Sequence, residues 1–205
     1  MKKIVVKGIT KRFGNKTVLD KFSLEIEKNS VFCLMGPSGC GKTTLVRIMT
    51  GLEKADKGRI RGINPDRIAF VFQEDRLIEH LSALSNAILP LGRSEDAKKA
   101  GMKALKLLGL NGEEEKPARK LSGGMARRVA IARAMLADAD IVFMDEPFKG
   151  LDKDNREKAI EFVKKYAKGK TLIVVTHSLS EAEKLNGTVF HMPIPMDKTK
   201  EMSEK

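Results

Sequence analysis

Gly-Pro-Ser-Gly-Cys-Gly-Lys-Thr, residues 36–43, is the stretch that decides the fold of this 205-residue chain. It matches the pattern G-x-x-x-x-G-K-[S/T] at every fixed position. The continuously apolar run Val31–Met35 precedes it and predicts a buried strand. A helical pattern follows it, with apolar residues on one face at Leu45, Ile48, Met49 and Leu52. A strand before and a helix after are the context in which this pattern binds a nucleoside triphosphate, and the alternative is a Gly-rich turn that arose by chance.

Phosphate binding explains the residue types of this loop. Glycines at positions 36, 39 and 41 let the backbone curl, so that successive N–H groups face phosphate oxygens. The loop enters a helix N-terminus, whose unpaired N–H groups and dipole also favour anions. Lys42 is expected to bridge the β- and γ-phosphates, and Thr43 to place its hydroxyl on Mg²⁺. The residues expected to bind the nucleotide here are Gly36, Pro37, Ser38, Gly39, Cys40, Gly41, Lys42, Thr43 and Thr44.

Two acidic residues end a second apolar run, Ile141–Met144. The run predicts a buried strand, and ligands bind at the carboxyl ends of strands in open α/β sheets. Asp145 is expected to hold Mg²⁺, directly or through water, and Glu146 to orient and polarise the water that attacks the γ-phosphate. A strand that happens to end in two solvated acids is the alternative interpretation.

Leu121-Ser122-Gly123-Gly124-Met125 precedes a predicted helix over 125–136. Ser122 can cap this helix, and the bare backbone at Gly123 and Gly124 makes its N-terminus a second anion-accepting end. Taken alone, an ordinary capped helix start explains these residues. A chain with one phosphate loop, however, has little use for a second phosphate-binding helix end, whereas ATP held by a partner would use it.

The remaining pattern alternates strands with helices. Ile4 and Val6, and later Phe22, Leu24 and Ile26, alternate with polar residues and predict N-terminal strands. Buried strands are predicted at 31–35, 141–144 and 172–176, a further strand at 68–72, and helices at 125–136 and 154–167. This order predicts an α/β fold with a mostly parallel sheet that is covered on both faces.

Residues 75–120 break this alternation. Apolar residues recur there at three- and four-residue steps, as at Leu77, Leu81, Leu84 and Ile88. The segment is predicted to be a helical insert between two halves of the α/β core. The polar tail, residues 197–205, is expected to fray.

Composition excludes several classes of protein. No apolar run approaches the roughly 18 residues of a membrane-spanning helix, and the N-terminal residues return to charge too quickly for a secretory signal. Cys33 and Cys40 provide neither a disulfide framework nor a metal-ligand spacing, which fits a reducing cytosol. The net charge of +12 favours anionic partners. The basic residues are scattered, however, and no Trp and one Tyr leave few aromatic rings for stacking on bases.

In their order along the chain, these motifs resemble the ATP-binding subunit of an ABC transporter, over nearly the whole sequence. The elements that carry the resemblance are the Walker A stretch Gly36–Thr43, Gln73 of the Q-loop, the signature Leu121–Gly124, the Walker B strand Ile141–Asp145 with Glu146, Leu151-Asp152 of the D-loop, and His177 after the last buried strand. The resemblance implies a P-loop NTPase core with a mostly parallel sheet, a small N-terminal antiparallel β-subdomain and an inserted helical subdomain. It implies one ATPase domain over residues 1–196, with the insert at about 75–120.

The resemblance also implies roles for further residues. Phe13 stands where the family places an aromatic residue that stacks on adenine, and a core position is the alternative for it. Gln73 is implied to contact Mg²⁺ and the attacking water, and His177 to hydrogen-bond the γ-phosphate. The implied catalytic residues are thus Glu146, His177, Lys42 and Gln73, and the implied Mg²⁺ ligands are Thr43, Gln73 and Asp145. Ser122, Gly123 and Gly124 would close over ATP that another subunit holds.

The implied active unit is a head-to-tail dimer, expected to be a homodimer, with two ATP molecules at its seam. It would drive a separate membrane permease from the cytoplasmic side of the membrane, with a solute-binding protein as an indirect partner and no nucleic acid. Glu146–Phe148 resembles the import group, and Val71–Leu77 is similar to the nitrate, taurine and aliphatic-sulfonate branch of importers. This suggests import of a small organic or inorganic anion.

Three departures from the family pattern accompany the resemblance. Met125 stands where Gln is commonest, Ala126-Arg127-Arg128 replaces a polar run, and Lys149-Gly150 replaces small polar residues in the D-loop. The segment Gly58–Asp66 is short, so a hairpin of the β-subdomain is expected to be trimmed.

Two other functions remain as alternatives. The net charge of +12 favours a soluble ABC-type ATPase that acts on nucleic acid or ribosomes, but such proteins usually carry two ATPase units or a long coiled-coil insertion. A phosphotransferase or GTPase would share the phosphate loop. The sequence has no Asn-Lys-x-Asp motif, and a kinase would not need Ser122-Gly123-Gly124.

Overall fold

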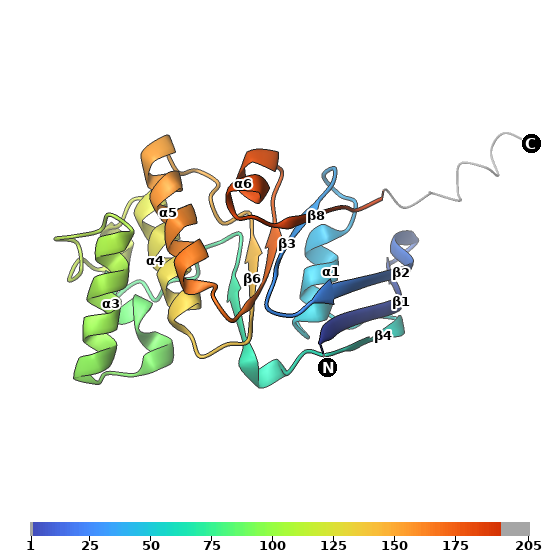
Figure 1. The fold of residues 1–205 in the computed structure, drawn as a ribbon, viewed down its shortest axis with the longest axis horizontal. Helices are drawn as coiled ribbons and strands as arrows, with labels where there is room; N and C mark the ends of the chain where they lie inside the picture. Colours follow the sequence, from blue (N-terminus) through green and yellow to red (C-terminus); the bar gives the residue numbers. More distant parts are fainter. Residues whose placement is uncertain (1, 194–205) are drawn as a thin grey trace, which may run out of the picture.

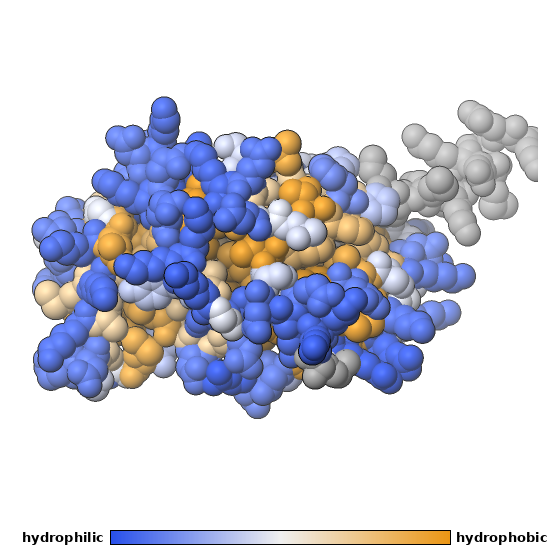
Figure 2. All heavy atoms as spheres, in the orientation of Figure 1, coloured by the Kyte–Doolittle hydropathy of each residue, from blue (hydrophilic) through white to orange (hydrophobic). Residues whose placement is uncertain are grey.

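A computed structural model describes residues 2–193 of the chain, as two sheets and the helices that cover them. A small sheet lies at one end of the molecule and a group of helices at the other, with a larger sheet between them (Figure 1). The tail predicted over 197–205 lies outside the described residues. On the face shown in Figure 2, hydrophilic side chains cover much of the surface, and the broadest apolar area lies along the middle.

The small sheet is antiparallel, with strand order β2-β1-β4. β1 (Lys3–Phe13) and β2 (Lys16–Glu27) form a hairpin whose two-residue turn contains Gly14 at a φ of 56°, a conformation that such turns require. β4 (Lys57–Arg61) pairs with β1 as an edge strand. We did not predict β4, because its Lys-Gly-Arg-Ile-Arg sequence is mostly exposed and lacks the alternation of a half-buried strand.

The larger sheet is parallel throughout, with strand order β5-β6-β7-β3-β8. Its strands are β3 (Val31–Met35), β5 (Ile68–Val71), β6 (Ile141–Asp145), β7 (Thr171–Val175) and β8 (Thr188–His191). Every residue of β6 and β7 is buried, because helices or the small sheet cover both faces. The predicted α/β fold with a mostly parallel sheet is confirmed.

Two hydrophobic cores lie on opposite faces of this sheet, and successive residues of β6 alternate between them. Val142 and Met144 join the core that contains α4 (Gly123–Leu136) and α5 (Lys153–Tyr166). Ile141 and Phe143 join the core formed with α1 (Lys42–Met49) and the small sheet. The two anion-accepting helix ends predicted from sequence, those of α1 and α4, therefore belong to opposite faces of one sheet.

The segment between β5 and α4 contains α2 (Ala83–Ala87), α3 (Glu95–Leu107) and two short 3₁₀ turns, Leu89–Leu91 and Ala118–Lys120. The predicted helical periodicity from Leu77 to Leu81 is wrong. The fully buried Asn86 bonds both the N–H and the carbonyl of Ile78, at 2.8 Å and 3.0 Å, and so holds the preceding chain as a loop.

Three further differences from the sequence predictions are local. Leu52 is exposed rather than on the buried face of a helix, because α1 ends at Met49 and Gly51 leaves the helix at a φ of 75°. The strand β8 and the helix α6 (Leu179–Lys184) were not predicted. Each spans six residues or fewer, too short for a periodicity to be recognised. A 3₁₀ turn, Pro65–Arg67, leads into β5.

Candidate nucleotide site

The phosphate loop connects the carboxyl end of β3 to the N-terminus of α1. Gly41, which precedes α1, has a φ of 102°, and a Cβ there would lie 3.0 Å from the carbonyl oxygen of Val18. A Cβ on Gly36 would lie 3.0 Å from the carbonyl oxygen of Met192. The backbone of the loop is thus open to a ligand on one side and packed tightly on the other. Gly41 is the N-cap residue of α1 and has no side chain to cap the helix. The N–H groups in the first turn of α1 therefore remain available to an anion.

Lys42 folds back over this loop. Its Nζ donates hydrogen bonds to the carbonyl oxygens of Gly36, at 2.8 Å, and Pro37, at 2.9 Å, and lies 3.9 Å from the Sγ of Cys40. The side chain is buried. The ammonium group therefore lies within the loop, where phosphate oxygens can replace its carbonyl partners.

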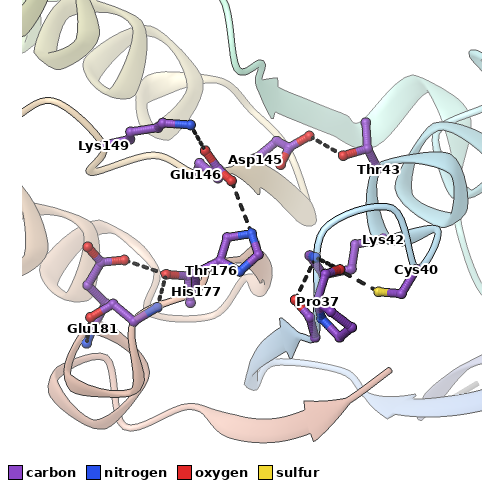
Figure 3. Close-up of polar contacts among 12 residues, drawn as sticks. Pro37, Cys40, Lys42, Thr43, Asp145, Glu146, Lys149, Thr176, His177 and Glu181 are labelled. Atoms are coloured by element: carbon purple, nitrogen blue, oxygen red, sulfur yellow. Dashed lines mark hydrogen bonds and ion pairs between the residues drawn. The ribbon is translucent and has the colours of Figure 1, made fainter. Parts of the chain in front are cut away.

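Oxygen ligands from three elements meet beside the loop. The Thr43 hydroxyl on α1 donates to Oδ2 of Asp145 at the end of β6, over 3.0 Å (Figure 3). A cavity of about 140 Å³ is lined by both residues and by Gln73, which follows β5. Burial raises the pKa of Asp145, and the hydrogen bond from Thr43 opposes that rise. Within residues 2–193 no three His, Cys, Asp or Glu side chains cluster, but Mg²⁺ commonly needs only one or two carboxylates beside substrate phosphates. This set of oxygens fits Mg²⁺.

Glu146 lies next to these residues, at a backbone φ of 47° that side chains rarely adopt. Its N–H donates to the carbonyl oxygen of Val175, over 2.9 Å. Its Oε2 accepts a hydrogen bond from Lys149, at 2.6 Å, and its Oε1 lies 3.3 Å from Nε2 of His177 (Figure 3). The hydrogen bond from Lys149 is the main cause that lowers the pKa of Glu146, and burial opposes it.

His177 lies in the loop between β7 and α6. The hydroxyl of Thr176 holds this loop, because it donates to Oε2 of Glu181 at 2.5 Å and accepts from the N–H of Ser178 at 3.1 Å. A cavity of about 320 Å³ is lined by residues of this loop together with Glu146 and Lys149. The structure therefore brings His177 to the same side of the sheet edge as Glu146.

Phe13, at the end of β1, is about half exposed, which rules out the core alternative for it. A cavity of about 360 Å³ is lined by Phe13 together with Gly39, Lys42 and Thr44 of the loop and α1. The Lys11 ammonium lies 4.9 Å from the centre of the Phe13 ring. The ring is thus available beside the phosphate loop, as an adenine-stacking residue must be.

Ser122, Gly123 and Gly124 are not brought to this loop. Ser122 caps α4, because its side chain accepts from the N–H of Met125 at 3.3 Å, as the sequence predicts. In the described part of the chain, the cavities lined by the phosphate loop or by Asp145 contain none of these three residues. A Cβ on Gly123 would meet no atom within 4 Å.

Sequence reasoning missed the connection between α4 and the segment after β5. Arg127 donates to the carbonyl oxygens of Phe72, at 2.6 Å, and Gln73, and its Nε lies 3.1 Å from Oδ1 of Asp75. Arg133 donates to the carbonyl oxygens of Asp75 and Arg76, both at 2.9 Å. The signal in the sequence was the departure at Ala126-Arg127-Arg128, which places charge on a helix with many buried residues.

The family described as ABC transporter matches residues 19–149, more than half of the chain. An aliphatic sulfonates import ATP-binding protein of Nocardia farcinica is 38% identical over 184 residues, which cover 89% of this chain and 74% of that protein. An Fe(3+) ions import ATP-binding protein of Vibrio cholerae is 37% identical over 92% of this chain, which spans only 58% of that protein.

The solved structures agree with these relatives. A dimeric ATP-binding cassette in a post-hydrolysis state with ADP and Pi has a TM-score of 0.81 to this chain, at 32% identity over 92% of this chain and 94% of its own. The resemblance drawn from the motifs is confirmed, including the sulfonate importers among the relatives. The chain belongs to the ABC transporter family, as an ATP-binding subunit that hydrolyses ATP.

Proposed function

We propose that two copies of this chain close head to tail on two ATP molecules, and that closure and hydrolysis drive a separate membrane permease. The observation that carries this proposal is that α1 and α4 begin on opposite faces of the sheet. Ser122–Gly124 line neither of the cavities beside the phosphate loop of the same chain, and in this proposal they close over ATP bound to a second copy. Dimeric structures of similar cassettes support this arrangement.

In this proposal the loop Gly36–Thr44 binds the phosphates through its N–H groups and Lys42, while Phe13 stacks on adenine. Thr43, Asp145 and Gln73 are the residues that would hold Mg²⁺. When bound, the ion would neutralise charge on the phosphate oxygens. The ligand types and the shared cavity support this assignment.

Glu146 acts as the general base in the proposed chemistry. It accepts one proton from a water molecule as the water oxygen bonds to the γ-phosphorus, and the bond from that phosphorus to the bridging oxygen breaks. The electron pair of the broken bond leaves on ADP, and inorganic phosphate is the second product. His177 donates a hydrogen bond to the γ-phosphate and steadies the water. The distance of 3.3 Å between Glu146 and His177 supports their acting on one water molecule.

The helical insert offers the surface on which a permease could dock. A groove of about 710 Å³ lies between α2 and α3, with apolar Leu84, Ile88 and Met102 and charged Arg93 and Lys98 among its lining residues. No helix within residues 2–193 has the length and apolar character that a membrane span needs. We propose that the chain binds its permease here, on the cytoplasmic side of the membrane.

The proposed cargo is a small anion taken up from outside the cell, with a solute-binding protein as an indirect partner. The names of the sulfonate-importing relatives support this substrate class. We further propose that the predicted unit 1–196 works as one ATPase domain with the insert at 75–120, and that it acts without nucleic acid.

Replacing the proposed base tests both the chemistry and the dimer. We expect Glu146→Gln to lower ATP hydrolysis by about 100-fold or more, because no other carboxylate in the described chain borders His177 in this way. With ATP and Mg²⁺ the variant should elute as a dimer in size-exclusion chromatography with light scattering, because it holds ATP without cleaving it.

Glu161→Gln on the outer face of α5 is the matched control and should hydrolyse ATP as the wild type does. A Glu146→Gln variant that hydrolyses ATP at the wild-type rate would refute the role of Glu146. An inactive variant that stays monomeric at saturating ATP would refute the dimer alone.

A further inference from the structure

The turn after β6 places a lysine beside the proposed base. Lys149 donates its backbone N–H to the carbonyl oxygen of Glu146, over 3.2 Å, which closes a four-residue turn. Pro147 fixes one backbone angle of this turn, and the side chain of Phe148 is completely buried and anchors it. The turn therefore brings the backbone of Lys149 close enough to Glu146 for the two side chains to meet.

Both oxygens of the Glu146 carboxylate have partners. Lys149 holds Oε2 at 2.6 Å, and His177 lies 3.3 Å from Oε1. Figure 3 shows that Lys149 reaches Glu146 from the side opposite to Asp145 and Thr43, the residues of the Mg²⁺ site. The ammonium group thus holds the carboxylate from the side away from the phosphate loop.

Lys149 has no other polar side-chain contact in residues 2–193. Its side chain is 63% exposed, whereas that of Glu146 is only 19% exposed. A contact of this kind contributes little to folding, because an exposed ion pair is screened by water. The main effect of the Lys149–Glu146 pair should therefore be on the part that Glu146 takes in ATP hydrolysis.

We propose that Lys149 is a positioning residue that slows ATP hydrolysis by restraining the Glu146 carboxylate. This inference rests on the proposed role of Glu146 as the base. To receive a proton from the attacking water, the carboxylate must turn toward the phosphate loop, and the pair with Lys149 must stretch or break. Breaking an exposed ion pair corresponds to a factor of about two to five in rate.

The experiment measures kcat and KM for ATP on the whole chain, with Mg²⁺, for three lysine variants. Lys149→Ser and Lys149→Gln should raise kcat by about two- to fivefold while KM stays within about twofold of wild type. Lys149→Arg should keep the wild-type rate, because a guanidinium group can hold the same oxygen. Thermal melting should be unchanged in all three, because Lys149 is exposed.

Lys164→Ser is the matched control. Lys164 pairs with Glu161 at the same three-residue spacing, over 3.0 Å, but on α5 and away from the nucleotide site. This variant should have the wild-type kcat. A Lys149→Ser variant faster than wild type, beside a Lys149→Arg variant at the wild-type rate, would support restraint by a cation.

An unchanged or lower kcat in both Lys149→Ser and Lys149→Gln would overturn the inference. So would a change in KM larger than the change in kcat, because Lys149 would then act on nucleotide binding or dimer closure. The parallel Glu146→Gln variant separates the two proposals. If it is inactive while Lys149→Ser is not faster, only the restraint fails, and if it remains active, the role of Glu146 itself fails.

Discussion

A side chain at Gly41 would be unfavourable for two separate reasons, the backbone conformation and the lack of space. Its φ of 102° favours glycine, and a Cβ would lie 3.0 Å from both the carbonyl oxygen of Val18 and the Cδ2 of Leu19. The small sheet is thus packed directly against the phosphate loop. A change at this residue should alter stability and ATP binding together.

We predict that Gly41→Ala lowers the free energy of unfolding by about 2–4 kcal/mol, from backbone strain plus overpacking. Gly112→Ala is the matched control, because Gly112 also has a positive φ, of 87°, but no atom lies within 4 Å of a Cβ there. It should lose only about 1 kcal/mol. Urea unfolding measures both values. Equal losses in the two variants would contradict a role for the close contact with Val18 and Leu19.

Single residues of the site were predictable where a motif fixes the backbone. The sequence pattern predicted Lys42, Thr43 and Asp145, and the structure places Thr43 and Asp145 within hydrogen-bond distance. The pair of Lys149 with Glu146 could not be predicted in this way. It depends on the φ of 47° at Glu146 and on the turn that follows, and neither leaves a periodic signal in the sequence.

Among the elements, α4 has a second connection besides its packing against the sheet. Arg127 is buried and takes the carbonyl oxygens of Phe72 and Gln73 as well as the carboxylate of Asp75. Arg127 therefore holds the segment that contains Gln73 against α4, the helix that begins at the signature. Replacing Arg127 leaves the two carbonyl oxygens without this donor and the Asp75 carboxylate without this cation.

We predict that Arg127→Met lowers the free energy of unfolding by about 2–4 kcal/mol, because it leaves the Asp75 carboxylate without this partner. It should also lower kcat, since the Gln73 backbone loses its support. The exposed Arg119→Gln is the control and should change the free energy of unfolding by less than about 0.5 kcal/mol.

Adding Asp75→Asn to Arg127→Met should cost less than the sum of the single changes, since the carboxylate is then gone. Additive losses in urea unfolding would contradict the Arg127–Asp75 pair.

The helices and strands that could be predicted are those with a strong periodic or continuous apolar signal in the sequence. The buried strands β3, β6 and β7 were predicted to within one residue at either end, because continuous apolar runs mark them. The helix predicted through Leu81 fails because Asn86 holds Ile78 in a loop, a tertiary contact that spacing cannot show. β4 escaped prediction because an exposed edge strand needs no apolar face.

Across the whole of residues 2–193, no contact requires glycine at the two signature positions, Gly123 and Gly124. Gly123 has open space where a Cβ would lie, and a Cβ on Gly124 would make only ordinary contacts, with Leu151 at 3.5 Å and the carbonyl oxygen of Gly150 at 3.9 Å. Neither has a positive φ. The open space leaves room for a ligand from outside the chain, and in the proposed dimer that ligand is ATP held by a second copy.

A substitution at Gly123 should affect dimer formation without affecting folding. We predict that Gly123→Asp folds at least as stably as the wild type, because it removes a glycine from a helix and adds an acidic residue to the first turn, where the dipole favours it. Each effect contributes about 0.5–1 kcal/mol at most. ATP binding to the monomer should be unchanged, because Gly123 lines neither of the cavities beside the phosphate loop.

In the Glu146→Gln background, the same substitution should abolish the ATP-dependent dimer, because the new carboxylate would face the phosphates of the other subunit's ATP. Gly123→Ala adds a side chain without charge and separates steric from electrostatic exclusion. Light scattering with and without ATP reads the dimer, and fluorescence of a labelled nucleotide reads binding to the monomer. A Gly123→Asp chain that still dimerises on ATP would contradict closure of the signature over a second copy's ATP. A chain that loses nucleotide binding as a monomer would instead place the signature at its own phosphate loop.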